Sequence, residues 1–378
     1  MKTSYIVWVV ILLVVIIGAF WYLGQNSTSP TSTQTSTSTT QTQTPAAFLP
    51  DATSSARSFS TVPSNGDANP YGVAFVPAGF PSGGPLNPGD ILVSNWNDTK
   101  IQGAGTTIVR ITPSGQQSLF FQAKKGSGLT TALSVLKSGF VIVGNLPTTD
   151  GTGATAKSGS LLVLNNKGGP VATLTDKTLV DGPWDMAVND NGAQVQAFVT
   201  NVLSGTVVRF DLVFTATGLT SQKGTIIASG YGHHTDPNAA VVGPTGLVYD
   251  AANDTLFVAS TVDNAVYSIP NAGSLTASQG MGVVVYKDDQ HLHGPLGLVQ
   301  APNGDFLVTN GDAINTDPSQ SSEVVEFTSG GVFVKELSLD PSGGGAFGLA
   351  IKASGSTATF AAVDDNIPTL FVWSIPIQ

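Results

Sequence analysis

Short apolar runs separated by turn residues fill the chain beyond residue 55. The runs are rich in Val, Phe, Ile and Leu, and Gly, Asn, Asp and Pro stand between them. Runs of this kind are typical of β-strands joined by tight turns. No later stretch shows the helical period of about 3.6 residues. The pattern therefore predicts an all-β fold.

One pattern of positions recurs six times: an anchor residue, an apolar run, a turn, a second apolar run and a terminal polar residue. Residues 297–310 read GLVQAPNGDFLVTN, and residues 132–145 read ALSVLKSGFVIVGN in the same frame. Two more apolar runs follow in each unit, except that the last unit ends after its third run. The anchors are Gly72, Ala132, Asp185, Gly246, Gly297 and Gly348.

These repeats predict a six-bladed β-propeller over residues 56–378. Six units of about 50 residues, each with four short strands, describe sheets arranged as blades around a central axis. The sixth unit lacks a fourth strand, but a spare apolar run, ARSFSTVPS at residues 56–64, precedes the first unit. We expect this N-terminal strand to complete the last blade, because pairing there removes an exposed sheet edge.

The units resemble the NHL-repeat and SMP-30/gluconolactonase-like group of six-bladed propellers. The resemblance lies in GPxGL at the start of a blade, the Asn-Gly or Asn-Asp turn, and a second strand closing on Asn or Ser. It covers about residues 56–378 and is clearest in the fourth and fifth units. Because that group contains lactonases, lyases, synthase-like enzymes and binding propellers, the resemblance implies a fold and leaves the function open.

The first 24 residues differ in kind from the rest. Lys2 precedes an apolar run that is long enough, at about 1.5 Å per residue, to cross a bilayer of about 30 Å. The run ends in GAFWYLG, whose aromatic residues suit a membrane interface better than a cleavage site. We predict an uncleaved signal anchor, a transmembrane helix at residues 1–24, with a cleaved signal peptide as the alternative. Lys2 favours a cytoplasmic N-terminus, which places the propeller outside the membrane at the cell surface.

A Ser/Thr/Pro-rich segment at residues 25–55 follows the predicted anchor. It has almost no apolar residues before Ala46, so we expect an extended, disordered stalk. Asn26, Asn97 and Asn253 each begin an N-glycosylation sequon, which fits an exported glycoprotein. Only 11% of residues are charged, and the net charge of −10 argues against nucleic acid as a partner.

A ring of polar residues is expected at one face of the propeller. The terminal position of each second strand lies at the same face as the loop that enters the first strand, so these residues approach one another around the channel mouth. Such residues also serve as ordinary turn formers, because Asn and Asp side chains bind nearby backbone. The ring comprises Asn95, Asn145, Asn201, Ser260, Asn310 and Asp364.

The same face is expected to carry the four histidines in its loops. Asn and Asp oxygens suit Ca²⁺, and neutral imidazoles suit Zn²⁺, so a divalent metal is a candidate cofactor. The candidate ligands are His234, His291, His293 and Asp364, with solvated histidines as the alternative. The resembling lactonases place Asn or Asp where inner strands begin, in a PNG pattern. This chain has other residues there, namely Tyr71, Trp184, Thr245, Leu296 and Phe347.

Asp185 is the one acidic residue expected on an inner strand, and it is the candidate base if the protein is an enzyme. The aromatic residues Tyr71, Trp96, Trp184 and Phe347 are expected near the same face, where they either fill the channel or line a binding surface. The sequence leads us to expect a cell-surface binding or scaffolding module for an extracellular protein or glycan, acting through the channel-mouth face. The alternative is a metal-dependent hydrolase or lyase of the SMP-30/lactonase-like type.

Overall fold

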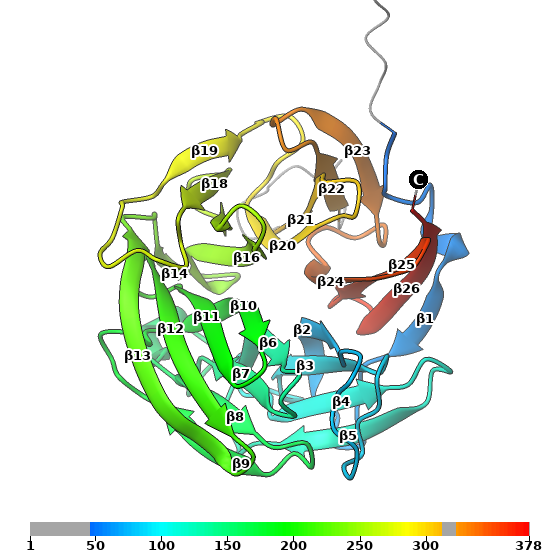
Figure 1. Ribbon diagram of the computed structural model, residues 1–378. Helices are drawn as coiled ribbons and strands as arrows, with labels where there is room; N and C mark the ends of the chain where they lie inside the picture. Colours follow the sequence, from blue (N-terminus) through cyan, green and yellow to red (C-terminus); the bar gives the residue numbers. More distant parts are fainter. Residues whose placement is uncertain (1–45, 312–322, 378) are drawn as a thin grey trace, which may run out of the picture. The chain divides into compact units, whose positions relative to one another are not determined.

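The computed structural model describes residues 46–311 and 323–377, which form a six-bladed β-propeller (Figure 1). Within these residues, six four-stranded antiparallel sheets surround the central channel, as the repeats predict. The predicted anchor and most of the predicted stalk lie outside the described residues. In the part of the chain that is described, no helix is apolar and long enough to span a bilayer.

The first five blades each consist of four strands that are consecutive in the chain. Blades 1 and 2 contain β2 (Ala68–Phe75), β3 (Ile91–Asn97), β4 (Thr107–Ile111), β5 (Gln117–Gln122), β6 (Leu129–Val135), β7 (Val141–Asn145), β8 (Ser160–Leu164) and β9 (Pro170–Leu174). Blade 3 contains β10 (Pro183–Asn191), β11 (Gln194–Asn201), β12 (Thr206–Thr215) and β13 (Gly218–Ser229). Blades 4 and 5 contain β16 (Pro244–Asp250), β17 (Thr255–Ser260), β18 (Ala265–Pro270), β19 (Val283–Tyr286), β20 (Pro295–Gln300), β21 (Phe306–Asn310), β22 (Glu323–Phe327) and β23 (Phe333–Ser338).

The sixth blade is closed by the N-terminal strand, as the sequence predicts. Its strands run in the order β1 (Arg57–Ser60), β26 (Thr369–Pro376), β25 (Thr357–Asp364) and β24 (Ala346–Ser354). β1 pairs antiparallel with β26, with Arg57 opposite Val372 and Ser60 opposite Thr369. The spare strand therefore supplies the fourth strand that the C-terminal unit lacks, and it joins the two ends of the propeller.

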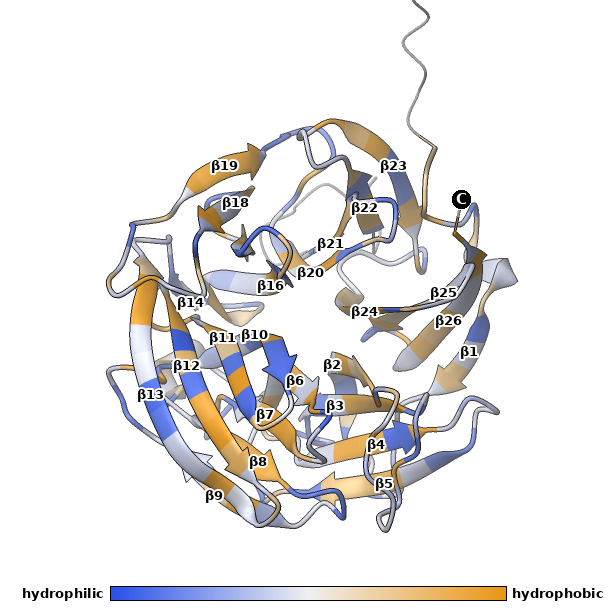
Figure 2. Ribbon diagram, in the orientation of Figure 1, coloured by the Kyte–Doolittle hydropathy of each residue, from blue (hydrophilic) through white to orange (hydrophobic). Residues whose placement is uncertain are grey.

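Apolar side chains fill the spaces between neighbouring blades, and Figure 2 shows the hydrophobic bands that they form along the strands. Between blades 4 and 5, for example, Val266 packs with Phe306 and Phe327, all fully buried. Tyr286 stacks on Phe327 across the same boundary, with ring centroids 4.3 Å apart. Each blade thus buries both of its faces, which explains why many strands read as nearly continuous apolar runs.

Hydroxyl groups connect the inner strands of successive blades. Each inner strand has a register shift near its start, as between Pro295 and Leu298. In blade 5 the Thr309 hydroxyl accepts a hydrogen bond from the Gly297 amide at 2.7 Å and donates to the Phe347 carbonyl of blade 6 at 2.9 Å. Ser94 and Thr200 bridge blades 1–2 and 3–4 in the same way. These bridges satisfy backbone groups that the irregular ladder leaves unpaired.

Two short 3₁₀ turns and a two-stranded hairpin complete the described structure. The turns are η1 (Thr53–Ser55) and η2 (Gly153–Thr155), and the hairpin consists of β14 (His234–Asp236) and β15 (Ala240–Val242). The hairpin lies in the connection between blades 3 and 4, where no strands were predicted. Its turn is held by the Asp236 carboxylate, which accepts hydrogen bonds from the Asn238 and Ala239 amides.

Residues 46–55, which we call the strap, pack against the propeller, although we predicted them to be part of the disordered stalk. Phe48 and Leu49 are buried. Their amides donate to the two carboxylate oxygens of Glu326 at 2.7 and 2.8 Å. The Lys335 amine donates to the Leu49 carbonyl at 3.0 Å. The apolar sequence AAFLP gives this segment enough surface to bury, unlike the Ser/Thr tract before it.

Candidate functional site

The six residues of the predicted polar ring are buried at the ends of their strands, each with at most 8% of its surface exposed. Their side chains mainly bind nearby backbone. Asn310 accepts from the His293 amide at 2.9 Å and donates to the His291 carbonyl at 2.8 Å. Asn201 contacts the loop before β10 in the same way. These residues hold the loops of their own blades, and none of the six lines the two channel cavities described below.

The predicted metal ligands lie on three separate parts of the chain, with His291 and His293 together in the loop before β20. His234 is exposed in β14, and Asp364 is fully buried at the end of β25. His291 stacks on Phe333 with ring centroids 3.7 Å apart, and its Nδ1 lies 2.5 Å from the Asp288 carboxylate. Across residues 46–311 and 323–377, no three His, Asp or Glu side chains gather closely enough to hold a metal ion. The proposed ligand set is therefore not assembled.

An aromatic layer fills the middle of the channel. Tyr71 lies between two stacked partners, Phe347 at 4.2 Å and Trp96 at 5.0 Å between ring centroids. Trp184 packs against both Tyr71 and Trp96 at 5.6 Å. All four side chains are buried, and all but Trp96 lie near the starts of inner strands. One cavity lies on each side of this aromatic layer, and Tyr71 lines both cavities.

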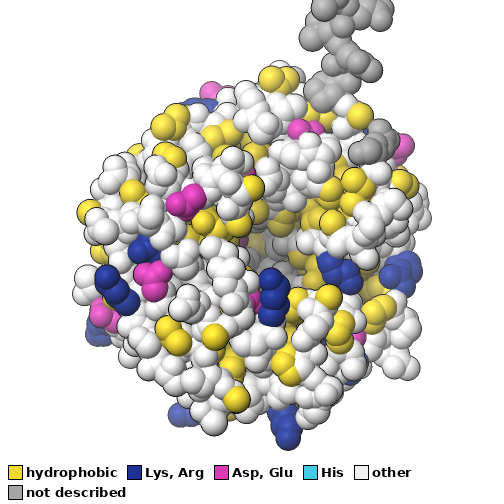
Figure 3. Space-filling view, in the orientation of Figure 1, with side chains coloured by type: hydrophobic (Ala, Val, Ile, Leu, Met, Phe, Trp, Pro, Cys, Tyr) yellow, Lys and Arg dark blue, Asp and Glu magenta, His cyan; other side chains and the backbone are white. Residues whose placement is uncertain are grey.

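The channel cavity, of about 330 Å³, lies among the inner strands beyond the aromatic layer. Most of the residues that line it are apolar, among them Val73, Leu133 and Leu349, and polar atoms also form a large part of the lining surface. Figure 3 shows the hollow at the centre of the propeller with hydrophobic side chains around it. Asp185 is the one carboxylate among the described lining residues, and no Lys, Arg or His joins it there.

Asp185 is held deep in the channel but keeps some contact with solvent. One carboxylate oxygen accepts from its neighbour's amide, Met186, at 2.7 Å, and the other accepts from the Leu247 amide of blade 4 at 3.0 Å. Burial raises the pKa of Asp185 from 3.8 to about 7, although these two hydrogen bonds oppose the shift. The physical cause is desolvation of a carboxylate that has no nearby positive charge. At neutral pH the group is present in both protonation states.

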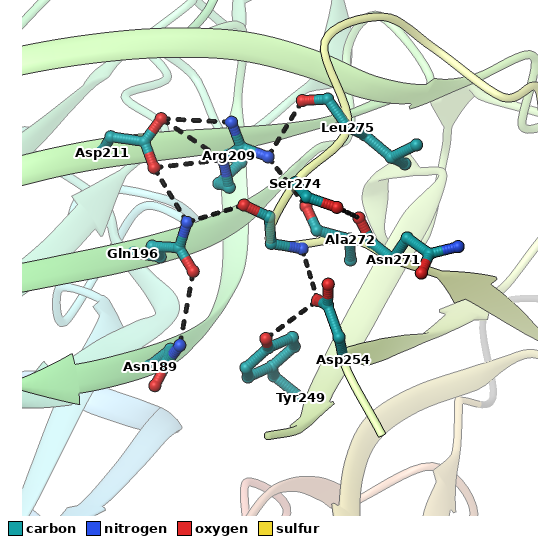
Figure 4. A network of polar contacts seen from close by, with 11 residues as sticks. Asn189, Gln196, Arg209, Asp211, Tyr249, Asp254, Asn271, Ala272, Ser274 and Leu275 are labelled. Atoms are coloured by element: carbon teal, nitrogen blue, oxygen red, sulfur yellow. Dashed lines mark hydrogen bonds and ion pairs between the residues drawn. The ribbon is translucent and has the colours of Figure 1, made fainter. Parts of the chain in front are cut away.

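A polar network supports the wall of this cavity between blades 3 and 4 (Figure 4). The cavity-lining Tyr249 donates to Asp254 at 2.9 Å, and Asp254 also accepts from the Gly273 amide at 2.6 Å. The buried guanidinium of Arg209 pairs with Asp211 at 3.1 Å and donates to two carbonyls of the loop that contains Gly273. Burial and the Asp254 contact raise the pKa of Tyr249 to about 12. Tyr249 therefore stays neutral, and Asp185 is the titrating group of the cavity near pH 7.

The mouth cavity, of about 190 Å³, lies on the other side of the aromatic layer. Tyr71, Trp184 and Phe347 line it, together with Asn69. The β14–β15 hairpin contributes Val241 and other residues, and the Asn238 carbonyl accepts a hydrogen bond from Gln102 of blade 1 at 3.4 Å. Since the hairpin spans from blade 3 to blade 1, it covers part of the channel mouth.

Neither cavity fits the metal that a lactonase-like propeller implies. A hard divalent ion needs several oxygen ligands. Asp185 stands without a second carboxylate among the described residues of its cavity, and both of its oxygens already accept backbone hydrogen bonds. In the mouth cavity, Tyr71, Trp184, Leu296 and Phe347 lie near the starts of inner strands, and Asp365 is the one carboxylate among the described lining residues. The residues present therefore favour chemistry without a bound metal.

Solved structures of other proteins share this architecture. A gluconolactonase from Xanthomonas campestris is 12% identical, with 85% of this chain and 90% of that chain covered and a TM-score of 0.51. A luciferin-regenerating enzyme is 10% identical, with 85% and 95% covered and a TM-score of 0.51. A calcium-binding regucalcin from Agrobacterium tumefaciens is 11% identical, with 82% and 91% covered and a TM-score of 0.50. No protein-family model and no curated protein sequence matches the chain. The similarity to the SMP-30/gluconolactonase-like propellers is confirmed at the level of the fold.

Proposed function

We propose that the protein is an enzyme that transfers protons to and from a small uncharged substrate in the channel cavity, with Asp185 as the acid–base group. The observation that carries this proposal is the position of Asp185: it is the one charged residue among the described residues that line a cavity of about 330 Å³. A general acid–base catalyst works best when its pKa lies near the working pH. The pKa of about 7 meets that condition.

Hydrolysis of a lactone or ester is the reaction class that we propose to test first. In its carboxylate form Asp185 would accept a proton from an attacking water, and in its acid form it would return that proton to the leaving oxygen. The residues themselves specify only the proton transfer. The reaction class comes from the gluconolactonase that shares the fold, and we propose a metal-independent reaction because the described residues that line the cavity with Asp185 include no second carboxylate.

The test is a turnover assay of the full-length protein on a panel of lactones and esters, with and without a chelator. We expect turnover that the chelator does not change, with a rate that varies around pH 7. Asp185→Asn should reduce kcat by about 100-fold or more. Asp364→Asn is the matched control, because Asp364 is a buried acid whose pKa is also raised to about 7 but which lies outside the cavity. No turnover on any substrate, or equal rates for wild type and Asp185→Asn, would contradict the proposal.

A cell-surface binding or scaffolding role for an extracellular protein or glycan is the second candidate function. It is favoured by the mouth cavity, which has aromatic walls and a polar rim on the face that the sequence analysis singled out. In this proposal the predicted anchor at residues 1–24 holds the propeller outside the membrane. Protease accessibility of the propeller on intact cells tests the placement: complete protection of the domain would contradict it.

A further inference from the structure

We propose that the mouth cavity is a second binding site, which takes a flat, uncharged aromatic ring carrying one hydrogen-bond donor, as in a phenol. This site is separate from the channel cavity, because the aromatic layer lies between them. Four features of the cavity support this assignment: its size, its walls, its charge and one unsatisfied polar atom.

The size of the cavity selects a single ring. Its volume is about 190 Å³. A water molecule occupies about 30 Å³ of liquid, so the cavity has room for roughly six waters. Drug-sized ligands need cavities of about 300–1,000 Å³. One substituted ring therefore fits inside the cavity, and a larger molecule could place only one of its rings there.

The walls are aromatic and already in place. Tyr71, Trp184 and Phe347 are each at most 8% exposed and are fixed by packing against one another. A ring that enters the cavity meets rigid aromatic surfaces, and offset or edge-to-face contacts between aromatic rings contribute about 0.5–1.5 kcal/mol beyond area burial. Because the wall rings are held in the free protein, binding does not require them to be ordered.

The charge around the cavity disfavours anions. Asp365 is the one charged side chain among its described lining residues, and no Lys, Arg or His lines it there. The other polar lining groups are neutral amides and hydroxyls, such as Gln102 and Thr245. A carboxylate or phosphate ligand would therefore lose its hydration without gaining a counter-charge.

Asn69 supplies an acceptor atom that has no hydrogen-bond donor in the structure. Its backbone is in the left-handed region, with φ of +61°. Its Oδ1 is buried and has no hydrogen-bond partner, although the residue lines the cavity. The left-handed backbone and the unpaired buried oxygen both destabilise the folded protein, and such unfavourable features are more frequent at sites that bind ligands. A ligand O–H or N–H that reaches this oxygen would satisfy it, which is why we assign a donor to the ring.

The experiment compares phenol with anisole, its O-methyl analogue, which has the same ring but no donor. Binding to the full-length protein is measured by ligand-observed NMR titration. We expect phenol to bind about fivefold more tightly than anisole, the effect of one hydrogen bond. Asn69→Gly should remove this preference while anisole binding persists, because glycine adopts the same backbone without strain and the variant should fold.

Asn271→Gly is the matched control, because Asn271 also has a positive φ, of +57°, but is exposed and outside the cavity. It should keep the wild-type preference. Asp185→Asn should also leave phenol binding unchanged, which separates this inference from the proposed function. Equal binding of phenol and anisole, no binding of either, or a preference that survives in Asn69→Gly would overturn the proposal. Loss of phenol binding in Asp185→Asn would place the ligand in the channel cavity and would overturn it as well.

Discussion

Replacing Asp185 with Asn should change how the stability of the protein depends on pH. The pKa of Asp185 is about 7 in the folded protein, against 3.8 for an ordinary Asp carboxyl. A raised folded-state pKa means that the folded protein binds the proton more tightly than the unfolded chain does. The stabilisation is complete below pH 3.8 and is lost as the pH rises through 7.

The magnitude follows from the size of the shift. A difference of about three pKa units, at about 1.36 kcal/mol each, corresponds to about 4 kcal/mol of stability lost between acid and alkaline pH. Asn carries no charge to desolvate, so the variant should not lose this free energy. It gives up one of the two backbone hydrogen bonds that Asp185 accepts from Met186 and Leu247, a loss of about 1 kcal/mol. We therefore expect Asp185→Asn to be more stable than wild type by about 3 kcal/mol above pH 8, and to have nearly equal stability near pH 4.

The assay is urea unfolding followed by tryptophan fluorescence between pH 4 and pH 8.5, with the free energy of unfolding extracted at each pH. The wild-type curve should fall more steeply with pH than the curve of the variant, and the difference should develop mainly between pH 4 and pH 7. Parallel curves, or a variant that is less stable at pH 8, would refute the reasoning that burial without a counter-charge controls this group.

Two further predictions concern how the blades are joined. Thr309→Val should lower the free energy of unfolding by about 1–3 kcal/mol in the same urea assay, because it leaves the Gly297 amide and the Phe347 carbonyl unpaired. Thr309→Ser keeps the hydroxyl and should cost less than half as much. Equal effects of the two changes would show that the hydroxyl bridge is unimportant. Deletion of residues 56–64 removes β1 and exposes the edge of β26, so it should lower the thermal unfolding temperature by more than about 10 °C or abolish folding. An unchanged unfolding temperature would exclude a stabilising role for the closure of blade 6 by β1.

The blade architecture could be predicted because the same pattern of apolar runs and turns recurs in the sequence once for each blade. Each anchor and terminal residue marks one hairpin, as at Gly297 and Asn310, and the structure places these hairpins on the inner strands. The closure by residues 56–64 followed from counting strands. Position alone also identified Asp185 as the acidic residue of an inner strand, although its pKa depends on a cavity that no local pattern reveals.

The features that the sequence left undetected depend on contacts distant in the chain. The β14–β15 hairpin has strands of only three residues, too short for a periodic signal. The strap docks because Glu326, 277 residues further along, accepts its amides. The histidine loops that precede blades 4 and 5 were expected to form one metal site from their place in the repeat. Instead, His291 pairs with Asp288 of its own loop.

The central claim is that Asp185 titrates near neutrality inside the channel, and its side-chain carboxyl can be followed directly. Carbon-13 NMR of the full-length protein labelled at Asp carboxyls, with Asp185→Asn used to assign the resonance, gives the pKa of this one group. The account predicts a midpoint of about 7 that is unchanged by a chelator. A midpoint at or below about 4, the value of an ordinary exposed Asp, would contradict it.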